Sequence, residues 1–350
     1  MHRFVPSHFQ DPVGLAKRLI RSRNDAAWFA MESAFLGLLL TPLDMLLQIA
    51  EKRRYCNAPK PKRPLILVCG APRSGTTLVA QALISHLPVC YFNNLTSVFP
   101  RAPIVANLLF GNPIGPKTLD YDSYYGKSVS FSGPNDALYI WDRWLGKDRT
   151  SIPTALSQSA KEQLSKFFGA YEQAFERPIV GKNNSLNTCA HLIAEVLDSA
   201  HFLCMARHPV YLAQSLLKAR TDIHGDPNTV YGVFTTTKAN DRKTDYIEDV
   251  CEQVFFYEQK IKEQQTIIGP ERFWIVSYET FCEKPEQLVK KVSEQILHQP
   301  IRAETVAQTL KPFHIHNKIT LQRELFHKIE STLARMRQQH NPSVERVVPF

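Results

Sequence analysis

The stretch LILVCGAPRSGTTLVAQAL, residues 65–83, decides the fold of this chain. Residues 65–70 form a short apolar run that ends in glycine, which is typical of a buried parallel strand. Residues 76–87 then have helical spacing, so we expect Ala82 to face a sheet and Gln81 to point away from it. Together these features predict a strand–loop–helix unit.

The loop inside this unit has the outline of a phosphate-binding loop. Gly70 and Gly75 have the G-x-x-x-x-G spacing of a Walker A loop, and free backbone N–H groups at a helix N-terminus favour an anion. A nucleotide triphosphatase has Lys followed by Ser or Thr after the second glycine, whereas this chain has Thr76 and Thr77. The cation is instead Arg73, within the loop, whose planar fork suits oxyanions. The other interpretation is a glycine turn that only joins strand to helix.

Magnesium chemistry is not indicated by the following strands. The apolar run HFLCMARHP, residues 201–209, ends in Arg207 where a nucleotide triphosphatase would place an acid. We therefore expect metal-independent chemistry.

The rest of the chain alternates strands and helices. Strands are expected at 177–182, 201–206 and 272–279, and helices at 187–200, 210–220 and 284–297. This alternation predicts an α/β fold of the P-loop type, with a mostly parallel sheet flanked by helices. Further helices are expected at 136–145, 157–175, 245–268 and 321–339, before a frayed tail.

We expect three parts along the chain. Residues 1–60 are a helical N-terminal extension and linker, residues 61–300 are the α/β domain, and residues 301–350 are a helical C-terminal segment. An insertion at about 95–177 would lie on the acceptor side of the domain.

The motif GAPRSGTTL resembles the 5′-phosphosulfate loop of sulfotransferases, which use 3′-phosphoadenosine 5′-phosphosulfate (PAPS) as sulfate donor. The arginine form is similar to that of Golgi-type, tyrosylprotein and bacterial members. The resemblance implies that the donor is bound by the loop residues Arg73, Ser74, Gly75, Thr76 and Thr77.

Two further motifs support this resemblance. ARHPVYLAQS, residues 206–215, resembles the family's 3′-phosphate motif, which implies that Arg207 and Ser215 bind that phosphate. Pro209 is placed to start a helix, so the Arg and the Ser can converge on one anion. VSYETFCEKPEQLVKKV resembles the strand and helix that close the nucleotide site, which implies that Tyr278 contacts the nucleotide. Taken alone, Arg207 would also suit a loop salt bridge, and Tyr278 would suit packing.

The catalytic residues follow less directly. Arg73 lies where the sulfate is expected, and Lys182 resembles a lysine that helps the bridging oxygen leave in tyrosylprotein-type members. Those enzymes carry a glutamate base after the first helix, but this chain has Asn93 and Asn94, which cannot accept a proton at neutral pH.

Asp136 is the substitute base that we predict. It lies near the start of an expected helix whose aromatic face, containing Trp141 and Trp144, could cover an acceptor sugar. Asp136 could instead be a helix N-terminal acid. His86 and Asp142 are the other candidate bases, although His86 suits a helix end and Asp142 could pair with a neighbour.

Composition is consistent with an anionic ligand. The 350 residues carry a formal net charge of +9, and a nucleic-acid partner is not expected because no basic–aromatic recognition motif is present. The seven cysteines have no CxxC pair or zinc-like spacing, which favours reduced thiols and a cytoplasmic location.

Residues 26–50 form a strongly apolar segment that contains Glu32, Pro42 and Asp44. We expect a helix packed on the domain or lying on a membrane surface. The alternative is a signal anchor with a luminal catalytic domain.

The sequence therefore predicts a PAPS-dependent sulfotransferase that acts on a hydroxyl of a carbohydrate, glycolipid or other small acceptor. The alternatives are a P-loop kinase or nucleotide triphosphatase, and a non-catalytic nucleotide-binding module. Acceptor loops are expected within 95–175 and 221–238.

Overall fold

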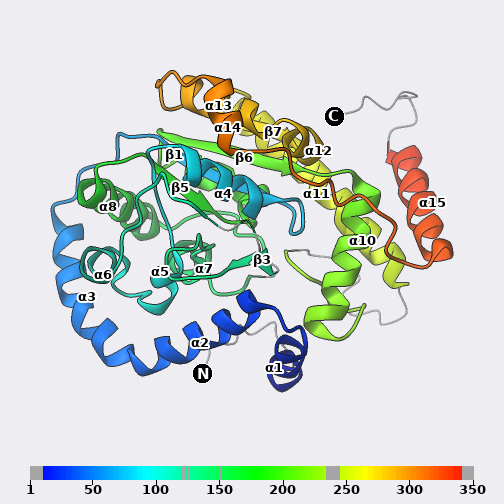
Figure 1. Ribbon diagram of the computed structural model, residues 1–350, viewed down its shortest axis with the longest axis horizontal. Helices are drawn as coiled ribbons and strands as arrows, with labels where there is room; N and C mark the ends of the chain where they lie inside the picture. Colours follow the sequence, from blue (N-terminus) through cyan, green and yellow to red (C-terminus); the bar gives the residue numbers. More distant parts are fainter. Residues whose placement is uncertain are drawn as a thin grey trace.

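The computed structural model describes residues 11–119, 121, 123–124, 126–149, 151–233 and 245–340 (Figure 1). A central parallel sheet is flanked by helices on both faces, which confirms the predicted α/β class. The expected frayed tail and residues 234–238 of the second expected acceptor loop lie outside the described residues.

The main sheet has five strands in the order β2-β5-β1-β6-β7, and every pairing in it is parallel. The strands are β1 (Leu65–Gly70), β2 (Cys90–Tyr91), β5 (Ile179–Lys182), β6 (Ala200–Ala206) and β7 (Phe273–Ser277). The three strands expected after β1 are confirmed, while the two-residue edge strand β2 was not expected. Because all strands are parallel, their carboxyl ends meet at one edge, where α/β sheets bind ligands.

Helices of the domain cover both faces of this sheet. They are α4 (Thr76–His86), α9 (Leu186–Ala194), α10 (Pro209–Ala219), α11 (Tyr246–Ile268), α12 (Tyr278–Glu283), α13 (Pro285–Gln295) and α14 (Ala303–Thr309), with a π-helical turn η1 (Arg220–His224) after α10. Alternate residues of β1 enter two different cores, since Leu67 packs in a cluster with α9 and Val68 packs in a cluster with α4 and α13.

The prediction that Gln81 points away from the core is wrong. Gln81 is fully buried, because α4 is enclosed by the sheet on one side and by later segments, including α13, on another. Helical periodicity identifies the apolar face with which a helix packs on the rest of the protein. It does not show when a helix is covered on several sides, and such a helix buries polar side chains too.

The insertion forms a second layer beside the sheet. It contains α5 (Asn94–Val98), α6 (Pro103–Phe110), the short antiparallel pair β3 (Ser123–Tyr124) and β4 (Lys127–Ser128), α7 (Leu138–Leu145) and α8 (Gln158–Phe175). The aromatic side chains of α7 and α8 join the core on the α9 side of the sheet.

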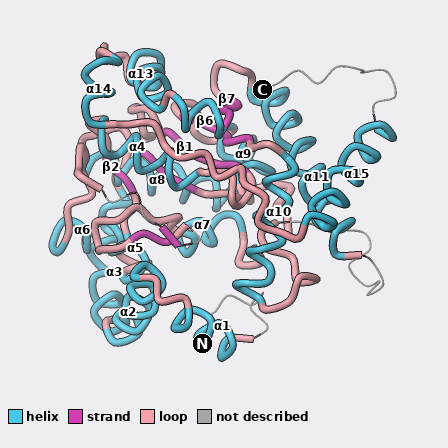
Figure 2. The backbone as a smooth tube through the Cα atoms, turned by 45° about the vertical axis from the view of Figure 1, so that its right-hand side comes forward, coloured by secondary structure: helices cyan, strands magenta, loops and turns pink. Residues whose placement is uncertain are grey.

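The two ends of the chain pack on the domain as helices (Figure 2). The N-terminal helices are α1 (Pro12–Arg21), α2 (Asp25–Leu39) and α3 (Thr41–Cys56), and they run along one side of the molecule (Figure 1). α2 packs on α5, and α3 packs on α6 and α8. The C-terminal helix α15 (Arg323–His340) packs on α10 and α11.

Candidate active site

The glycine loop connects β1 to α4 in a conformation that requires its two glycines. Gly70 has φ 141° and Gly75 has φ 91°, a region that side chains other than glycine rarely adopt. A Cβ at Gly70 would lie 2.6 Å from the Met205 carbonyl oxygen, and one at Gly75 would lie 2.5 Å from Cδ2 of Tyr278. The loop is thus packed tightly between β6 and α12, and the start of α4 is left to face the carboxyl edge of the sheet.

Arg73, Ser215 and Arg207 lie together beside this loop. Arg73 has a left-handed backbone (φ 73°), and its Nε donates a hydrogen bond to Oγ of Ser215 at 3.2 Å. Nη1 of Arg207 donates to the carbonyl oxygen of Arg73 at 2.9 Å. The structure therefore brings the two sequence motifs, which are far apart in the chain, into one cluster with two guanidinium groups.

The guanidinium of Arg207 is held on several sides. It lies 4.8 Å from the centre of the Tyr278 ring, and its Nε donates to Oδ1 of Asn317 at 3.3 Å. Asn317 in turn donates from Nδ2 to Oε1 of Glu279 at 2.9 Å. Asn317 belongs to the segment between α14 and α15 and was not predicted. In the sequence, Asn317 is one polar residue in a long connection between two helices, and this is too weak a signal to identify a site.

The electrostatics of this cluster favour an anion. Burial lowers the pKa of Arg207, and the neighbouring Arg73 cation lowers it further. Burial also lowers the pKa of His316, and the nearby His314, Arg207 and Arg73 groups act in the same direction. Because an anion between these groups would offset their repulsion, the cluster has the chemistry of a phosphate site.

A second group of side chains lies at the start of α4. Lys182, at the carboxyl end of β5, is 3% exposed and donates from Nζ to Oγ1 of Thr77 at 2.9 Å. The same ammonium forms an ion pair with Asp136, whose side chain is 22% exposed. A Cβ at Gly126, in the turn between β3 and β4, would lie 3.4 Å from Nζ of Lys182 and 4.0 Å from Oδ2 of Asp136. The hairpin turn therefore lies directly over the Lys182–Asp136 pair.

The other hydroxyls of the loop have different surroundings. Ser74 is fully buried, and its Oγ donates to the Ala71 carbonyl oxygen at 2.7 Å, so it stabilises the loop from within. Thr76 donates from Oγ1 to Oδ1 of Asn184 at 3.0 Å. Asn184 is the second residue after β5, and its position just beyond a buried strand is the signal that would have identified it.

Asn93 and Asn94 hold the insertion in place. Nδ2 of Asn94 donates to the Ser128 carbonyl oxygen at 2.9 Å, and Oδ1 of Asn94 accepts from Nδ2 of Asn135 at 2.7 Å. Asn93 donates from Nδ2 to Oδ1 of Asn107 at 2.6 Å. The pair thus fixes the hairpin and the residue next to Asp136.

The remaining candidate bases have structural partners elsewhere. The ring nitrogens of His86 lie 2.9 Å from the Ala82 carbonyl oxygen and 3.1 Å from Oγ1 of Thr309. His86 is at the far end of α4 from Thr76, about 15 Å along the helix axis at ~1.5 Å per residue. Asp142 pairs with Nη2 of Arg149 at 2.7 Å. Asp136 alone among the three lies beside Lys182, and it precedes α7, which begins at Leu138.

The expectation that the α7 aromatics cover an acceptor is wrong for both tryptophans. Trp141 is 1% exposed and packs against Phe168 of α8, and Trp144 is 6% exposed and packs against both Phe167 and Phe168. The indole rings belong to the hydrophobic core because α8 covers that face of α7.

Within the described parts of the chain, no group of three or more His, Cys, Asp or Glu side chains is arranged to hold a metal ion. His314 and His316 lie against each other with ring centres 5.1 Å apart, without a third such ligand among those residues.

Comparisons with known proteins agree on one family. A family model described as the sulfotransferase family matches residues 64–299, roughly two thirds of the chain. The crystal structure of a sulfotransferase from Mycobacterium avium has a TM-score of 0.55 and 16% identity, covering 98% of this chain and 93% of that chain. A second sulfotransferase, from Mycobacterium tuberculosis, has a TM-score of 0.52 and 11% identity, covering 95% and 94%. At these identities the likeness shows the fold, and no curated protein sequence gives a significant match.

Proposed function

The chain belongs to the sulfotransferase family and is a PAPS-dependent sulfotransferase, and from this premise we propose that its acceptor is a hydroxyl of a carbohydrate, glycolipid or other small molecule. The observation that carries the proposed mechanism is the Lys182–Asp136 ion pair at the start of α4, beside the cluster of Arg73, Arg207 and Ser215.

The residues present fit the donor. PAPS has two anionic ends, a phosphosulfate and a 3′-phosphate, and the site has two groups of cations to match. The glycine loop leads into the N-terminus of α4, where Lys182 donates a hydrogen bond to the Thr77 hydroxyl. Arg73, Arg207 and Ser215 form the second group, so Arg73, which we expected beside the sulfate, lies against Ser215 of the 3′-phosphate motif. When bound, the donor supplies an activated sulfuryl group.

We assign the following roles to the chain's own residues. Arg207 and Ser215 hold the 3′-phosphate, Tyr278 packs beside it, and the start of α4 with Thr77 holds the phosphosulfate end. Lys182 would donate a hydrogen bond to the bridging oxygen of the bound donor, because its ammonium is nearly buried and already directed at the Thr77 hydroxyl.

Asp136 is the proposed general base. One carboxylate oxygen pairs with Lys182, while the other lies near the hairpin turn at Gly126. There it would accept the proton of the acceptor hydroxyl as that oxygen attacks sulfur. The products are the sulfated acceptor and 3′-phosphoadenosine 5′-phosphate, so the reaction parallels phosphoryl transfer by in-line displacement.

A cavity beside the hairpin that is lined in part by hydroxyl groups supports a hydroxyl-rich acceptor. It has a volume of about 360 Å³ and is lined by residues of the insertion, namely Lys117, Thr118, Leu119, Ser128, Val129, Ser130, Ser132, Gly133 and Pro134. Four of these carry hydroxyl groups, which suit a sugar better than an aromatic phenol. Pro134 lies two residues before Asp136 along the chain.

We further propose a cytoplasmic location. All seven cysteines are free thiols and six of them are buried, which suits a reducing compartment.

The test compares nucleotides and then acceptors. We expect 3′-phosphoadenosine 5′-phosphate to raise the melting temperature of the protein by several degrees at about 100-fold excess over Kd, and ATP with magnesium to raise it much less. Transfer of radiolabelled sulfate from PAPS to a panel of glycans and glycolipids then identifies the acceptor. A stronger response to ATP with magnesium would favour the P-loop kinase alternative, and nucleotide binding without transfer to any acceptor would favour a binding module.

A further inference from the structure

Exposed apolar side chains are concentrated on one side of the molecule. Among the described residues, most of the large apolar side chains that are exposed lie on α2, on α3, at the end of α6 or just after β4. Those on the first two helices define what we call the elbow surface: Trp28, Phe35, Leu38, Leu39, Met45, Leu46 and Ile49, which are 44–64% exposed. Such a concentration is unusual for the surface of a soluble monomer and indicates an interaction site.

The orientation of these helices is fixed by two buried acids. Asp44 is fully buried, and its Oδ1 accepts from the backbone N–H groups of Arg101 and Ala102 at 3.1 and 3.2 Å. Glu51 is also fully buried and accepts from the N–H of Val105 at 2.9 Å. Both carboxylates therefore bind the N-terminal end of α6. Leu43 and Leu47 of α3 also pack inward, whereas Met45, Leu46 and Ile49 face outward. A helix with buried acids and an exposed apolar row is the reverse of an ordinary surface helix.

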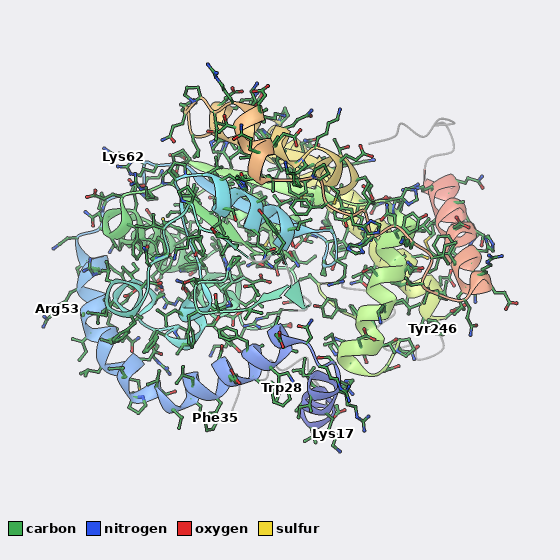
Figure 3. All side chains as sticks on the ribbon, in the orientation of Figure 1. Lys17, Trp28, Phe35, Arg53, Lys62 and Tyr246 are labelled. Atoms are coloured by element: carbon green, nitrogen blue, oxygen red, sulfur yellow. The ribbon has the colours of Figure 1, made fainter. Side chains whose placement is uncertain are left out.

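The elbow surface lies along the outside of the molecule and does not form a single straight span. Figure 3 shows Trp28 and Phe35 on the outer side of α2. Among the described residues no single helix is long and apolar enough to cross a membrane, and α2 and α3 pass that test only as a pair bent by 72°. A bent pair with one apolar face suits a position in the interface of a bilayer.

Basic side chains stand at both ends of the elbow surface. Lys17, Arg21 and Arg23 precede it and Lys52, Arg53 and Arg54 follow it, and all six are exposed. Figure 3 shows Lys17 and Arg53 at its two ends. Between residues 28 and 49 the only exposed acid is Glu32. Since basic side chains near a membrane are attracted to anionic headgroups, this arrangement is complementary to an anionic lipid surface.

A second copy of the chain fits this surface less well. A two-fold contact would place the elbow surface of one subunit against the elbow surface of the other. The basic ends of each subunit would then lie either against the basic ends or against the apolar side chains of the second copy. The net charge of +9 adds to that repulsion.

We propose that the α2–α3 elbow docks on an anionic lipid bilayer, with its apolar face in the interface and its basic ends on the headgroups. The elbow is joined to the acceptor side of the protein, because the Phe29 ring of α2 packs edge-on at 5.2 Å against Phe131, which follows β4. Docking would hold the cavity beside the β3–β4 hairpin near the membrane surface. The proposal is independent of the acceptor, so failed docking would leave the proposed transfer reaction standing.

Sedimentation with vesicles tests the proposal on the full chain. We expect wild type to bind vesicles of phosphatidylcholine mixed with phosphatidylglycerol, and to bind pure phosphatidylcholine vesicles at least roughly tenfold more weakly. Ile49→Glu should weaken binding to the anionic vesicles roughly tenfold or more, because it places a charged side chain where the proposal puts an exposed isoleucine in the apolar interface of the bilayer. Ile267→Glu is the matched control, since both isoleucines are helical and 56% exposed, and it should bind as wild type does.

A charge variant and the oligomeric state complete the test. Lys52→Gln/Arg53→Gln/Arg54→Gln should weaken anionic binding at least roughly tenfold, whereas Lys284→Gln/Arg302→Gln/Arg323→Gln, exposed on other elements, should not. The proposal is overturned if wild type does not bind anionic vesicles, or if Ile49→Glu and Ile267→Glu bind equally well. It is also overturned if wild type forms a dimer that Ile49→Glu converts to a monomer without any vesicle binding.

Discussion

Arg73 of the glycine loop donates a hydrogen bond to Ser215 of α10 across 3.2 Å, although 142 residues separate them in the chain. This contact joins the loop after β1 to the helix after β6, the two segments that the sequence assigned to different phosphates. Arg207 contacts the same loop through the Arg73 carbonyl oxygen. The two anion-binding motifs are therefore parts of one site, and a change in one motif should affect binding at the other.

Arg207→Ala should weaken binding of 3′-phosphoadenosine 5′-phosphate roughly tenfold to hundredfold, because a hydrogen bond to a charged group contributes about 1.5–3 kcal/mol. Ser215→Ala should weaken it only a few-fold, since its hydroxyl is neutral. Isothermal titration calorimetry gives both values. AMP, which lacks the 3′-phosphate, is the control ligand, and its affinity should change much less. Equal losses for the two nucleotides would show that Arg207 only maintains the fold of the site.

Local pattern predicted the main parts of this site. The strand β1, the glycine loop and α4 follow from 19 consecutive residues of sequence, and the Arg207–Ser215 spacing places Arg207 just before α10 and Ser215 on its second turn. Strand ends are readable in this way because a buried apolar run stops abruptly at the first polar residue. Lys182 is the last residue of β5 and Asn184 is the second residue after it, so both are at such a position.

Other parts depend on contacts that no local pattern encodes. Asn317 reaches Arg207 from a segment 110 residues away. The indoles of Trp141 and Trp144 enter the core because α8 happens to cover them. Asp44 interrupts an apolar segment in the sequence, and only the fold shows that it binds the N-terminal end of α6. A periodic pattern indicates that a face is apolar or polar, but tertiary packing decides what covers it.

Gly75→Ala should abolish most nucleotide binding, and Gly146→Ala should not. Both glycines have φ 91°, so alanine strains the backbone at either position, by about 1–2 kcal/mol in the left-handed region of Gly75 and by about 1–3 kcal/mol at Gly146, whose ψ is 161°. At Gly75 the new Cβ would also lie 2.5 Å from the Tyr278 ring, which Arg207 covers, whereas at Gly146 nothing lies within 4 Å. Urea denaturation and calorimetry with 3′-phosphoadenosine 5′-phosphate measure the two effects. If both variants lose the same stability and affinity, the Tyr278 contact has no role.

His201 of β6 should make the protein less stable in mild acid. Burial lowers the pKa of His201 below its ordinary value of 6.5, and the nearby Arg272 cation acts in the same direction. The unfolded state therefore binds the proton more tightly, so stability is full above pH 6.5 and falls as pH decreases below it. His201→Gln should show a shallower loss than wild type when the unfolding free energy is measured across this range. Because His224 and His316 also have lowered pKa values, only the difference between the two proteins tests His201. Parallel curves would contradict the assignment.

Lys182→Ala should lower kcat for sulfuryl transfer by about 100- to 1000-fold, the usual effect of removing one donor to a departing oxygen. Asp136→Asn keeps the size of the side chain but cannot accept a proton, so we expect about 100- to 10,000-fold lower kcat. Affinity for 3′-phosphoadenosine 5′-phosphate should change little in Asp136→Asn, because the 3′-phosphate cluster is untouched. Transfer of radiolabelled sulfate from PAPS to the acceptor found in the panel measures the rates.

Lys161→Ala is the matched control for these variants, since Lys161 also pairs with a carboxylate, Glu195, but on the surface of α8. Its kcat should equal that of wild type. If Asp136→Asn retains the wild-type rate, the base is another group, and Asp136 serves only to hold Lys182 in place.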